Sequence, residues 1–159
     1  MTYLDTSALV KRFFQEKGTT VVNSFFTTGE PIATATIAFI EVHAALSRKK
    51  RYKKLKHRPY VTCSGQFDKE YESFVRVELQ QAILELARNL VKQHSLRSLD
   101  AIHLASALDL QMALQEPVVF AAADSTLIKI AAAVGLNDLH VEMEETKRVQ
   151  EQPGLARRK

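Results

Sequence analysis

The sequence predicts an α/β fold in which helices cover both faces of a mostly parallel central sheet of about five strands. Short apolar segments alternate along the chain with longer segments of helical periodicity. This alternation is typical of parallel strands joined by crossover helices. Residues 118–122 also form a continuous apolar run, as expected for a strand that is buried on both faces.

Strands are expected in five short segments. The first of them ends at Asp5, and the following Thr6 and Ser7 make this position a good N-terminus for a helix. Turn residues or helical segments bound each of the others. The five expected strands are residues 2–4, 31–34, 75–78, 118–122 and 139–142.

Helices are expected between these strands. The hydroxyl of Ser98 is expected to cap a long helix, and Gly135 is expected to end a later one. Residues 51–65, which include Pro59 and Gly65, are expected to form a loop or a frayed helix. The expected helices are residues 8–16, 20–27, 36–50, 68–74, 80–94, 98–114 and 124–134.

One domain is expected. The chain has 159 residues, of which 46% are hydrophobic, so it is long enough to bury a core. No repeat or linker divides it, and residues 1–142 are assigned to this domain. Residues 143–159 are rich in charge and contain Pro153 and Gly154, so they are expected to form a flexible C-terminal tail.

Cysteine content and the N-terminal sequence indicate a cytoplasmic protein. The single cysteine, Cys63, excludes a disulfide framework and a cysteine-based zinc cluster. Asp5 and Lys11 interrupt any apolar core of a signal peptide. No apolar run reaches the roughly 18 residues that a membrane span requires. We therefore expect a cytoplasmic protein without a membrane-spanning segment.

Basic residues are concentrated in one segment. Eight of the 22 lysines and arginines lie between Arg48 and Arg58, and without them 14 basic residues face 18 acidic ones. Such a patch can bind the phosphate backbone of a nucleic acid, although a solvated loop would have the same composition. The candidate contact residues are Arg48, Lys49, Lys50, Lys53 and Lys54.

Four acidic residues are the candidate catalytic and metal-binding residues. Asp5 and Asp124 each follow a predicted strand, at the edge where parallel sheets bind ligands, although each could simply be a helix N-cap. Glu41 lies on a helix that is expected to be buried nearly all round, where a carboxylate without a partner is costly. Asp100 lies in the first turn of an apolar helix, three residues before His103 and on the same face. Its alternative role is to complement the helix dipole.

Convergence of these four carboxylates would require a cation or protonation, because like charges repel. Mg²⁺ or Mn²⁺ is expected, since hard divalent ions prefer oxygen ligands. Zinc is not expected, because no paired cysteines or histidines occur at ligand spacing. Such a site can activate a water molecule and neutralise a phosphodiester in the transition state.

At this point four sequence blocks, in their order and spacing, resemble the PIN-domain signature. The resemblance is closest to the VapC toxins of toxin–antitoxin pairs, and it covers residues 2–142. The blocks are Leu-Asp-Thr-Ser-Ala-Leu-Val-Lys from Leu4, Ile-Glu-Val around Glu41, Leu-Asp-Ala-Ile-His-Leu-Ala from Leu99, and Asp-Ser-Thr-Leu from Asp124.

This resemblance implies a three-layer α/β/α fold and an endoribonuclease that depends on Mg²⁺ or Mn²⁺ and hydrolyses RNA with a metal-activated water. It also implies a homodimer and a cognate antitoxin as partner. The four acids match the family's metal-binding positions, and Thr6 or Ser7 matches the hydroxyl residue that supports the first of them. His103 matches a position that is often histidine, with packing and hydrogen bonding as its expected role.

Two features depart from the family pattern. Ala122 stands where many relatives have a hydroxyl residue, which affects how Asp124 is oriented. The basic segment and the loop after it, residues 48–65, also look longer than usual in these toxins. This segment could contact either RNA or the antitoxin.

The sequence leaves two alternatives to a metal-dependent ribonuclease. A PIN-type scaffold could bind RNA without cleaving it, although all four acids are present. A phosphatase of the haloacid-dehalogenase type would use Asp5 as its nucleophile. That mechanism needs a second aspartate two residues later, and Ser7 stands there instead.

Overall fold

The computed structural model describes residues 1–52 and 55–151. Five parallel strands form one sheet in the order β3-β2-β1-β4-β5. The strands are β1 (Thr2–Leu4), β2 (Ile32–Ala35), β3 (Val75–Val77), β4 (Val119–Ala122) and β5 (Asn137–His140). The predicted α/β fold with a parallel sheet of about five strands is therefore confirmed.

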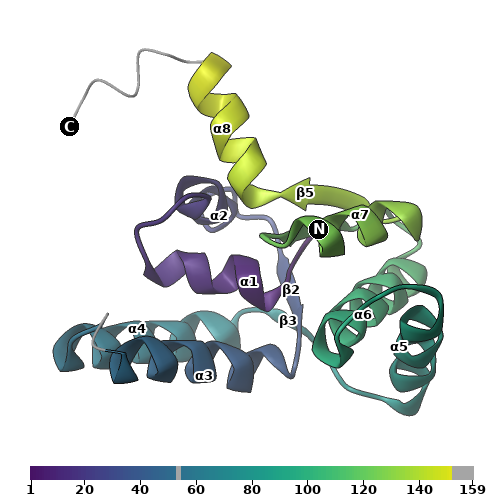
Figure 1. Ribbon diagram of the computed structural model, residues 1–159, viewed down its shortest axis with the longest axis horizontal. Coiled ribbons are helices and arrows are strands. Elements are labelled where there is room, and N and C mark those ends of the chain that lie inside the picture. Colours follow the sequence, from purple (N-terminus) through teal and green to yellow (C-terminus); the bar gives the residue numbers. More distant parts are fainter. Residues whose placement is uncertain (53–54, 152–159) are drawn as a thin grey trace.

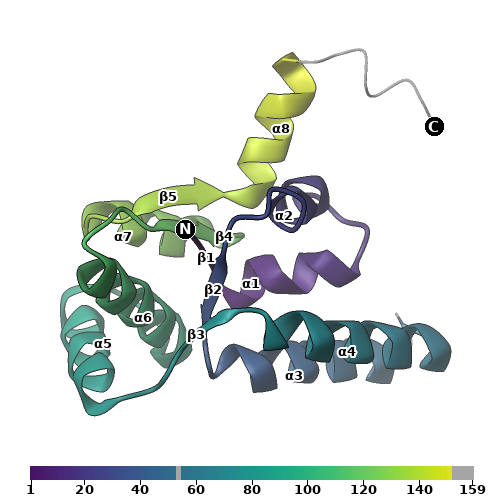
Figure 2. The same ribbon diagram turned by 180° about the vertical axis from the view of Figure 1, so that it is seen from behind.

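Helices form a layer on each face of the sheet (Figures 1 and 2). One layer contains α1 (Thr6–Leu9), the 3₁₀ helix η1 (Val10–Phe13), α2 (Thr19–Phe25), α3 (Ala38–Arg51), α4 (His57–Glu72) and α8 (Val141–Glu151). The other layer contains α5 (Gln81–Gln93), α6 (Ser98–Leu114) and α7 (Ser125–Ala133). Within the described ranges, no helix combines the length and apolar character that crossing a bilayer requires.

Each face of the sheet has its own hydrophobic core, because side chains alternate along a strand. Tyr3 and Phe120 face the layer of α5, α6 and α7, and their rings stack with centroids 5.6 Å apart. Leu4 and Ala121 face the opposite layer. The central strands β1 and β4 are thus buried on both faces, as the apolar run predicted for β4 requires.

Helices α3 and α4 pack side by side as a hairpin that extends away from the sheet (Figure 1). The prediction of a loop or frayed helix over residues 51–65 was wrong for residues 57–65, because α4 is continuous from His57 to Glu72. Pro59 lies in its first turn, where a backbone N–H has no partner within the helix. Burial of Phe67 and Tyr71 stabilises the helix despite Gly65 in its interior.

Two polar side chains of α3 face α4. His43 Nε2 lies 2.8 Å from Asp68 Oδ1, and Ser47 Oγ lies 3.3 Å from the Tyr60 hydroxyl. Ile40, in contrast, is 65% exposed. The expectation that this helix is buried nearly all round was therefore wrong, because the hairpin covers the polar side of α3 and leaves part of its apolar side open.

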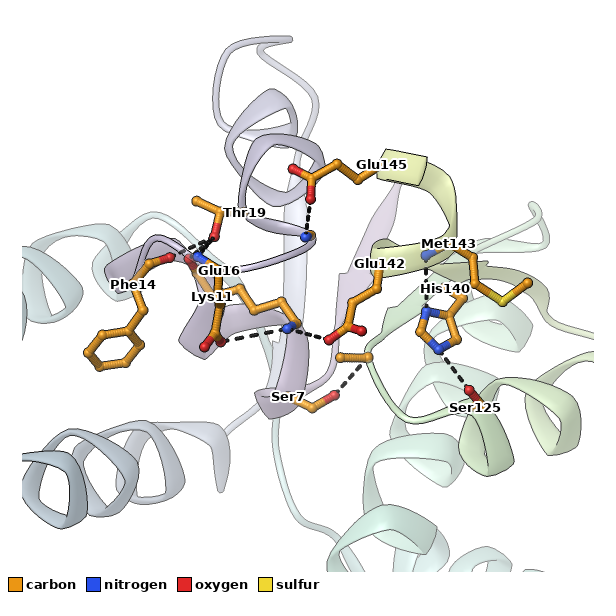
Figure 3. Close-up of polar contacts among 12 residues, drawn as sticks. Ser7, Lys11, Phe14, Glu16, Thr19, Ser125, His140, Glu142, Met143 and Glu145 are labelled. Atoms are coloured by element: carbon orange, nitrogen blue, oxygen red, sulfur yellow. Dashed lines mark hydrogen bonds and ion pairs between the residues drawn. The ribbon is translucent and has the colours of Figure 1, made fainter. Parts of the chain in front are cut away.

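Residues 143–151 belong to α8, so this part of the expected flexible tail is helical. Polar contacts hold the helix against the body (Figure 3). The buried Lys11 donates to Glu142 over 2.7 Å, and Glu145 accepts hydrogen bonds from the backbone N–H groups of Gly18 and Thr20. Charge alone therefore misled the prediction, because these charges have specific partners. Residues 152–159 lie outside the described residues.

Candidate active site

Asp5 and Asp124 lie at the carboxyl ends of the adjacent strands β1 and β4, and each caps a helix. Asp5 Oδ2 accepts from the backbone N–H of Ser7 over 2.9 Å. Asp124 Oδ1 accepts from the N–H groups of Thr126 and Leu127 over 2.8 and 2.9 Å. The caps use one oxygen of each carboxylate, so a helix cap and a ligand for a cation are compatible roles for these residues.

Ser7 connects the two loops that carry these aspartates. Its Oγ accepts a 2.9 Å hydrogen bond from the backbone N–H of Ala123 (Figure 3). The segment before Asp124 is thereby held from the first turn of α1, although Ala122 supplies no hydroxyl of its own. A hydroxyl from this helix thus orients the backbone next to Asp124.

Glu41 is held by two side chains. Thr6 Oγ1 donates to Glu41 Oε2 over 2.8 Å, and His103 Nε2 lies 2.8 Å from the same oxygen. His103 Nδ1 in turn lies 2.9 Å from the hydroxyl of Tyr3, which is buried in β1. A hydrogen-bond chain therefore runs from the sheet through the imidazole to Glu41, whose side chain is 19% exposed.

The electrostatics of this pair favour its charged form. Burial by itself would lower the pKa of His103, but the carboxylates of Asp5, Glu41 and Asp100 outweigh it and raise that pKa. Burial would likewise raise the pKa of Glu41, yet the hydrogen bonds from His103 and Thr6 and the charge of His103 lower it. His103 Nε2 also lies 3.7 Å from Asp5 Oδ1, so Asp5, which follows β1, and Glu41 of α3 both lie beside its ring.

Asp100 is paired with Arg97, a residue that the sequence analysis missed. Arg97 Nε donates to Asp100 Oδ2 over 2.8 Å, and Nη2 donates to Oδ1 over 3.3 Å. The bond to Asp100 and its charge raise the pKa of Arg97, and the charges of Asp124 and Asp5 add to this effect. The spacing of three residues within one helical turn was a signal that could have identified the pair.

The four predicted acids are thus connected through two basic side chains, His103 and Arg97. Asp5 and Glu41 meet at His103, and Arg97 lies within electrostatic reach of Asp100, Asp124 and Asp5. Among the residues that the structure describes, no three histidine, cysteine, aspartate or glutamate side chains are placed closely enough to hold a metal ion. The chemistry of the donors nevertheless fits Mg²⁺ or Mn²⁺, because every candidate ligand is a carboxylate oxygen.

The predicted nucleic-acid contacts lie at the far end of the α3–α4 hairpin. Arg48, Lys50 and Arg51 are exposed there. The Lys50 ammonium lies 4.5 Å from the ring centroid of Tyr60. Lys49 is less exposed, and its ammonium lies 3.4 Å from Glu16 Oε2 and 3.4 Å from the ring centroid of Phe14. It stabilises the attachment of the hairpin rather than extending into solvent. Lys53 and Lys54 lie outside the described residues.

Comparisons with known proteins agree with this architecture. The sequence model of the PIN domain family matches residues 2–133. Ribonuclease VapC45 of Mycobacterium tuberculosis is 30% identical over 108 residues, covering 68% of this chain and 75% of that protein. Ribonuclease VapC47 of the same species is 29% identical over 139 residues, covering 85% and 93%.

Among solved structures, a toxin–antitoxin complex from Klebsiella pneumoniae contains a chain of similar fold. The TM-score is 0.59 at 16% sequence identity, over 89% of this chain and 98% of that one. The three-layer α/β/α arrangement is therefore shared with that chain. Because the family match spans most of the sequence, including all four acids, this chain belongs to the PIN domain family.

Proposed function

We propose that this chain is an endoribonuclease that depends on a divalent metal ion and serves as the toxin of a type II toxin–antitoxin pair. One observation carries the proposal: the carboxylates of Asp5 and Glu41 lie 3.7 and 2.8 Å from Nε2 of the buried His103. A concentration of negative charge at the carboxyl edge of a parallel sheet supports a cation site at that edge.

Asp5, Glu41, Asp100 and Asp124 would hold Mg²⁺ or Mn²⁺ through their carboxylate oxygens. A bound ion supplies positive charge to a phosphodiester and lowers the pKa of the water that attacks it. Other groups of the chain hold these carboxylates in position. Backbone N–H groups hold the two aspartates that cap helices, and Thr6 and His103 hold Glu41. Such fixed positions reduce the reorganisation that the reaction requires.

The choice of RNA as substrate is supported by the names of the relatives. VapC45 and VapC47 are named ribonucleases. The exposed Arg48, Lys50 and Arg51 at the end of the hairpin would add contacts to phosphates.

An antitoxin partner is supported by the toxin–antitoxin complex of similar fold. A homodimer and a cytoplasmic location are part of the same proposal, on the resemblance to the VapC toxins. Size-exclusion chromatography of the protein alone would detect the homodimer. The same measurement with a co-expressed antitoxin would detect the complex of the two proteins.

Cleavage of a structured RNA by the purified protein tests the activity. We expect cleavage only with Mg²⁺ or Mn²⁺, and a loss of about 100-fold or more in Asp5→Asn and Asp100→Asn. Glu85→Gln, on the exposed side of α5, is the matched control and should cleave normally. Binding of the RNA without cleavage in either metal would instead favour the scaffold function.

A further inference from the structure

A cavity of about 360 Å³ lies between α7, β5 and α8. Its position relative to the candidate active site follows from the strand register. His140 is paired with Ala122, so the carboxyl end of β5 lies next to the carboxyl end of β4. Ser125, which directly follows Asp124, lines the cavity together with His140. The cavity therefore lies at the carboxyl end of β5, next to the end of β4 that carries Asp124.

Ser125 and His140 form a polar wall of the cavity (Figure 3). The backbone N–H of Met143 donates to His140 Nδ1 over 3.5 Å, and His140 Nε2 lies 2.9 Å from Ser125 Oγ. Because Nδ1 accepts, the neutral ring carries its proton on Nε2 and donates it to Ser125 Oγ. The hydroxyl proton of Ser125 is then directed to another acceptor, which a ligand can supply.

The remaining walls combine apolar surface with charge. Ile128 and Met143 line the cavity, and the exposed, flexible thioether of Met143 adapts well to a flat ring. Lys129 and Lys147 add positive charge, and Asp138 and Glu144 add carboxylates, of which Glu144 accepts from Arg148 Nε over 3.0 Å. A cavity of this volume, with apolar walls and a few polar groups, is typical of small-molecule sites.

We propose that this cavity binds one base of the substrate RNA, next to the phosphodiester that is cleaved. The inference rests on the proposed ribonuclease function. Met143 contacts the face of the base, and the Ser125 hydroxyl and the Asp138 carboxylate bond to its edge. The two lysines of the cavity attract the neighbouring phosphates, which position the strand without reading its sequence. The cavity thereby determines which nucleotide lies beside the cut.

Cleavage of a pool of random single-stranded RNA, followed by sequencing of the ends, measures the preferred nucleotide at each position around the cut. An oligonucleotide of the preferred sequence is then compared with one that carries an abasic ribose at the preferred position. The wild type should cut the abasic oligonucleotide about tenfold more slowly, as the loss of one or two hydrogen bonds and a stacking contact predicts.

Ser125→Ala and Met143→Ala should lose most of the nucleotide preference and cut the two oligonucleotides at similar rates. Both residues are exposed, so the fold should tolerate these changes. Met112→Ala, at an exposed methionine of α6, is the matched control and should keep the full tenfold difference.

The two proposals fail in different ways. A wild-type protein that cuts no RNA overturns the ribonuclease function, and the base site with it. A wild type that cuts RNA without a preference beside the cut overturns the base site alone. The base site is also overturned if Ser125→Ala and Met143→Ala keep the nucleotide preference and still cut the abasic oligonucleotide about tenfold more slowly.

Discussion

His103 Nε2 lies 2.8 Å from Glu41 Oε2, and this contact joins residues that are 62 positions apart in the chain. The imidazole is only 1% exposed and also meets the hydroxyl of Tyr3. The orientation of a candidate metal ligand thus depends on a side chain inside the core. Residues of the core and of the candidate active site are therefore energetically linked.

His103→Ala should lower the free energy of unfolding by about 2–4 kcal/mol, because it leaves a cavity and removes the buried partner of Tyr3 and Glu41. Urea denaturation followed by circular dichroism measures this difference. His57→Ala, at an exposed position in the first turn of α4, should change stability by less than about 0.5 kcal/mol. Equal effects of the two changes would contradict the structural role of His103.

Arg97→Ala should tighten the binding of Mn²⁺ about two- to fivefold, because the guanidinium and the ion compete for the carboxylate of Asp100. The effect is expected to be small, since the Arg97 side chain is 78% exposed and the ion pair is screened by solvent. Isothermal titration calorimetry measures the affinity, with the exposed Arg88→Ala on α5 as control. Unchanged or weaker binding would exclude competition at Asp100.

The combined change of Arg48, Lys50 and Arg51 to glutamine should weaken RNA binding and flatten its salt dependence. Each lost phosphate contact on a single strand lowers the slope of log affinity against log salt by about 0.7, so a change of about 2 is expected. Fluorescence anisotropy at several salt concentrations measures it. Lys49→Gln should leave the slope nearly unchanged, because Glu16 and Phe14 hold this ammonium. An unaltered salt dependence in the triple variant would show that these residues form a solvated surface that does not contact the RNA phosphates.

Glu145 gives a prediction on pH. Burial by itself would raise its pKa, but the hydrogen bonds from Gly18 and Thr20 and the charge of Lys11 lower it below the ordinary value of 4.5. A lowered pKa means that the stabilisation is present above pH 4.5 and is lost as the pH falls through the folded-state value. Glu145→Gln should therefore destabilise the protein by about 1 kcal/mol at neutral pH, and this difference should shrink in acid.

Unfolding by urea between pH 3 and 7 measures the effect of Glu145→Gln. The exposed Glu116→Gln is the control, and its difference from the wild type should stay small throughout. A constant difference at position 145 over the whole range would show that the carboxylate charge does not hold α8 against α2.

Gly65→Ala should raise the free energy of unfolding by about 0.5–1 kcal/mol. Gly65 lies inside α4, and an added Cβ would meet no atom within 4 Å. Gly135→Ala should have the opposite effect, since Gly135 has a φ of +91° after α7. Thermal unfolding of both variants measures the two signs. A loss of stability in Gly65→Ala would contradict a regular helix at that position.

Most of the sheet and its edge could be predicted from the sequence, because β1, β2 and β4 are short apolar segments and Asp5 and Asp124 directly follow two of them. The last strand was expected at residues 139–142 but is Asn137–His140, because its sequence is mostly polar and Val141 already begins α8. The start and end of α6 at Ser98 and Leu114 were also predicted. The expected cap was wrong in detail, because Arg97 is the N-cap residue and no side-chain hydrogen bond caps this helix.

Features that depend on contacts between distant segments could not be predicted. The helix α4 is stabilised by packing on α3, which overrides the local signals of Pro59 and Gly65. The helix α8 is held by Lys11 and by the N-terminus of α2, which lie more than 120 positions earlier in the chain. Likewise, nothing local in the sequence indicates that Glu41 and His103 face one another.

The central place of β1 has a consequence for protein synthesis. Strand β1 is hydrogen-bonded on one side to β4, which is made more than 110 positions later. Until β4 has been translated, Asp5 has no neighbouring Asp124, and Ser7 has no Ala123 to bond. A nascent chain therefore carries an incomplete site until β4 and Asp124 have been made, and a product that ends before Val119 lacks a complete one.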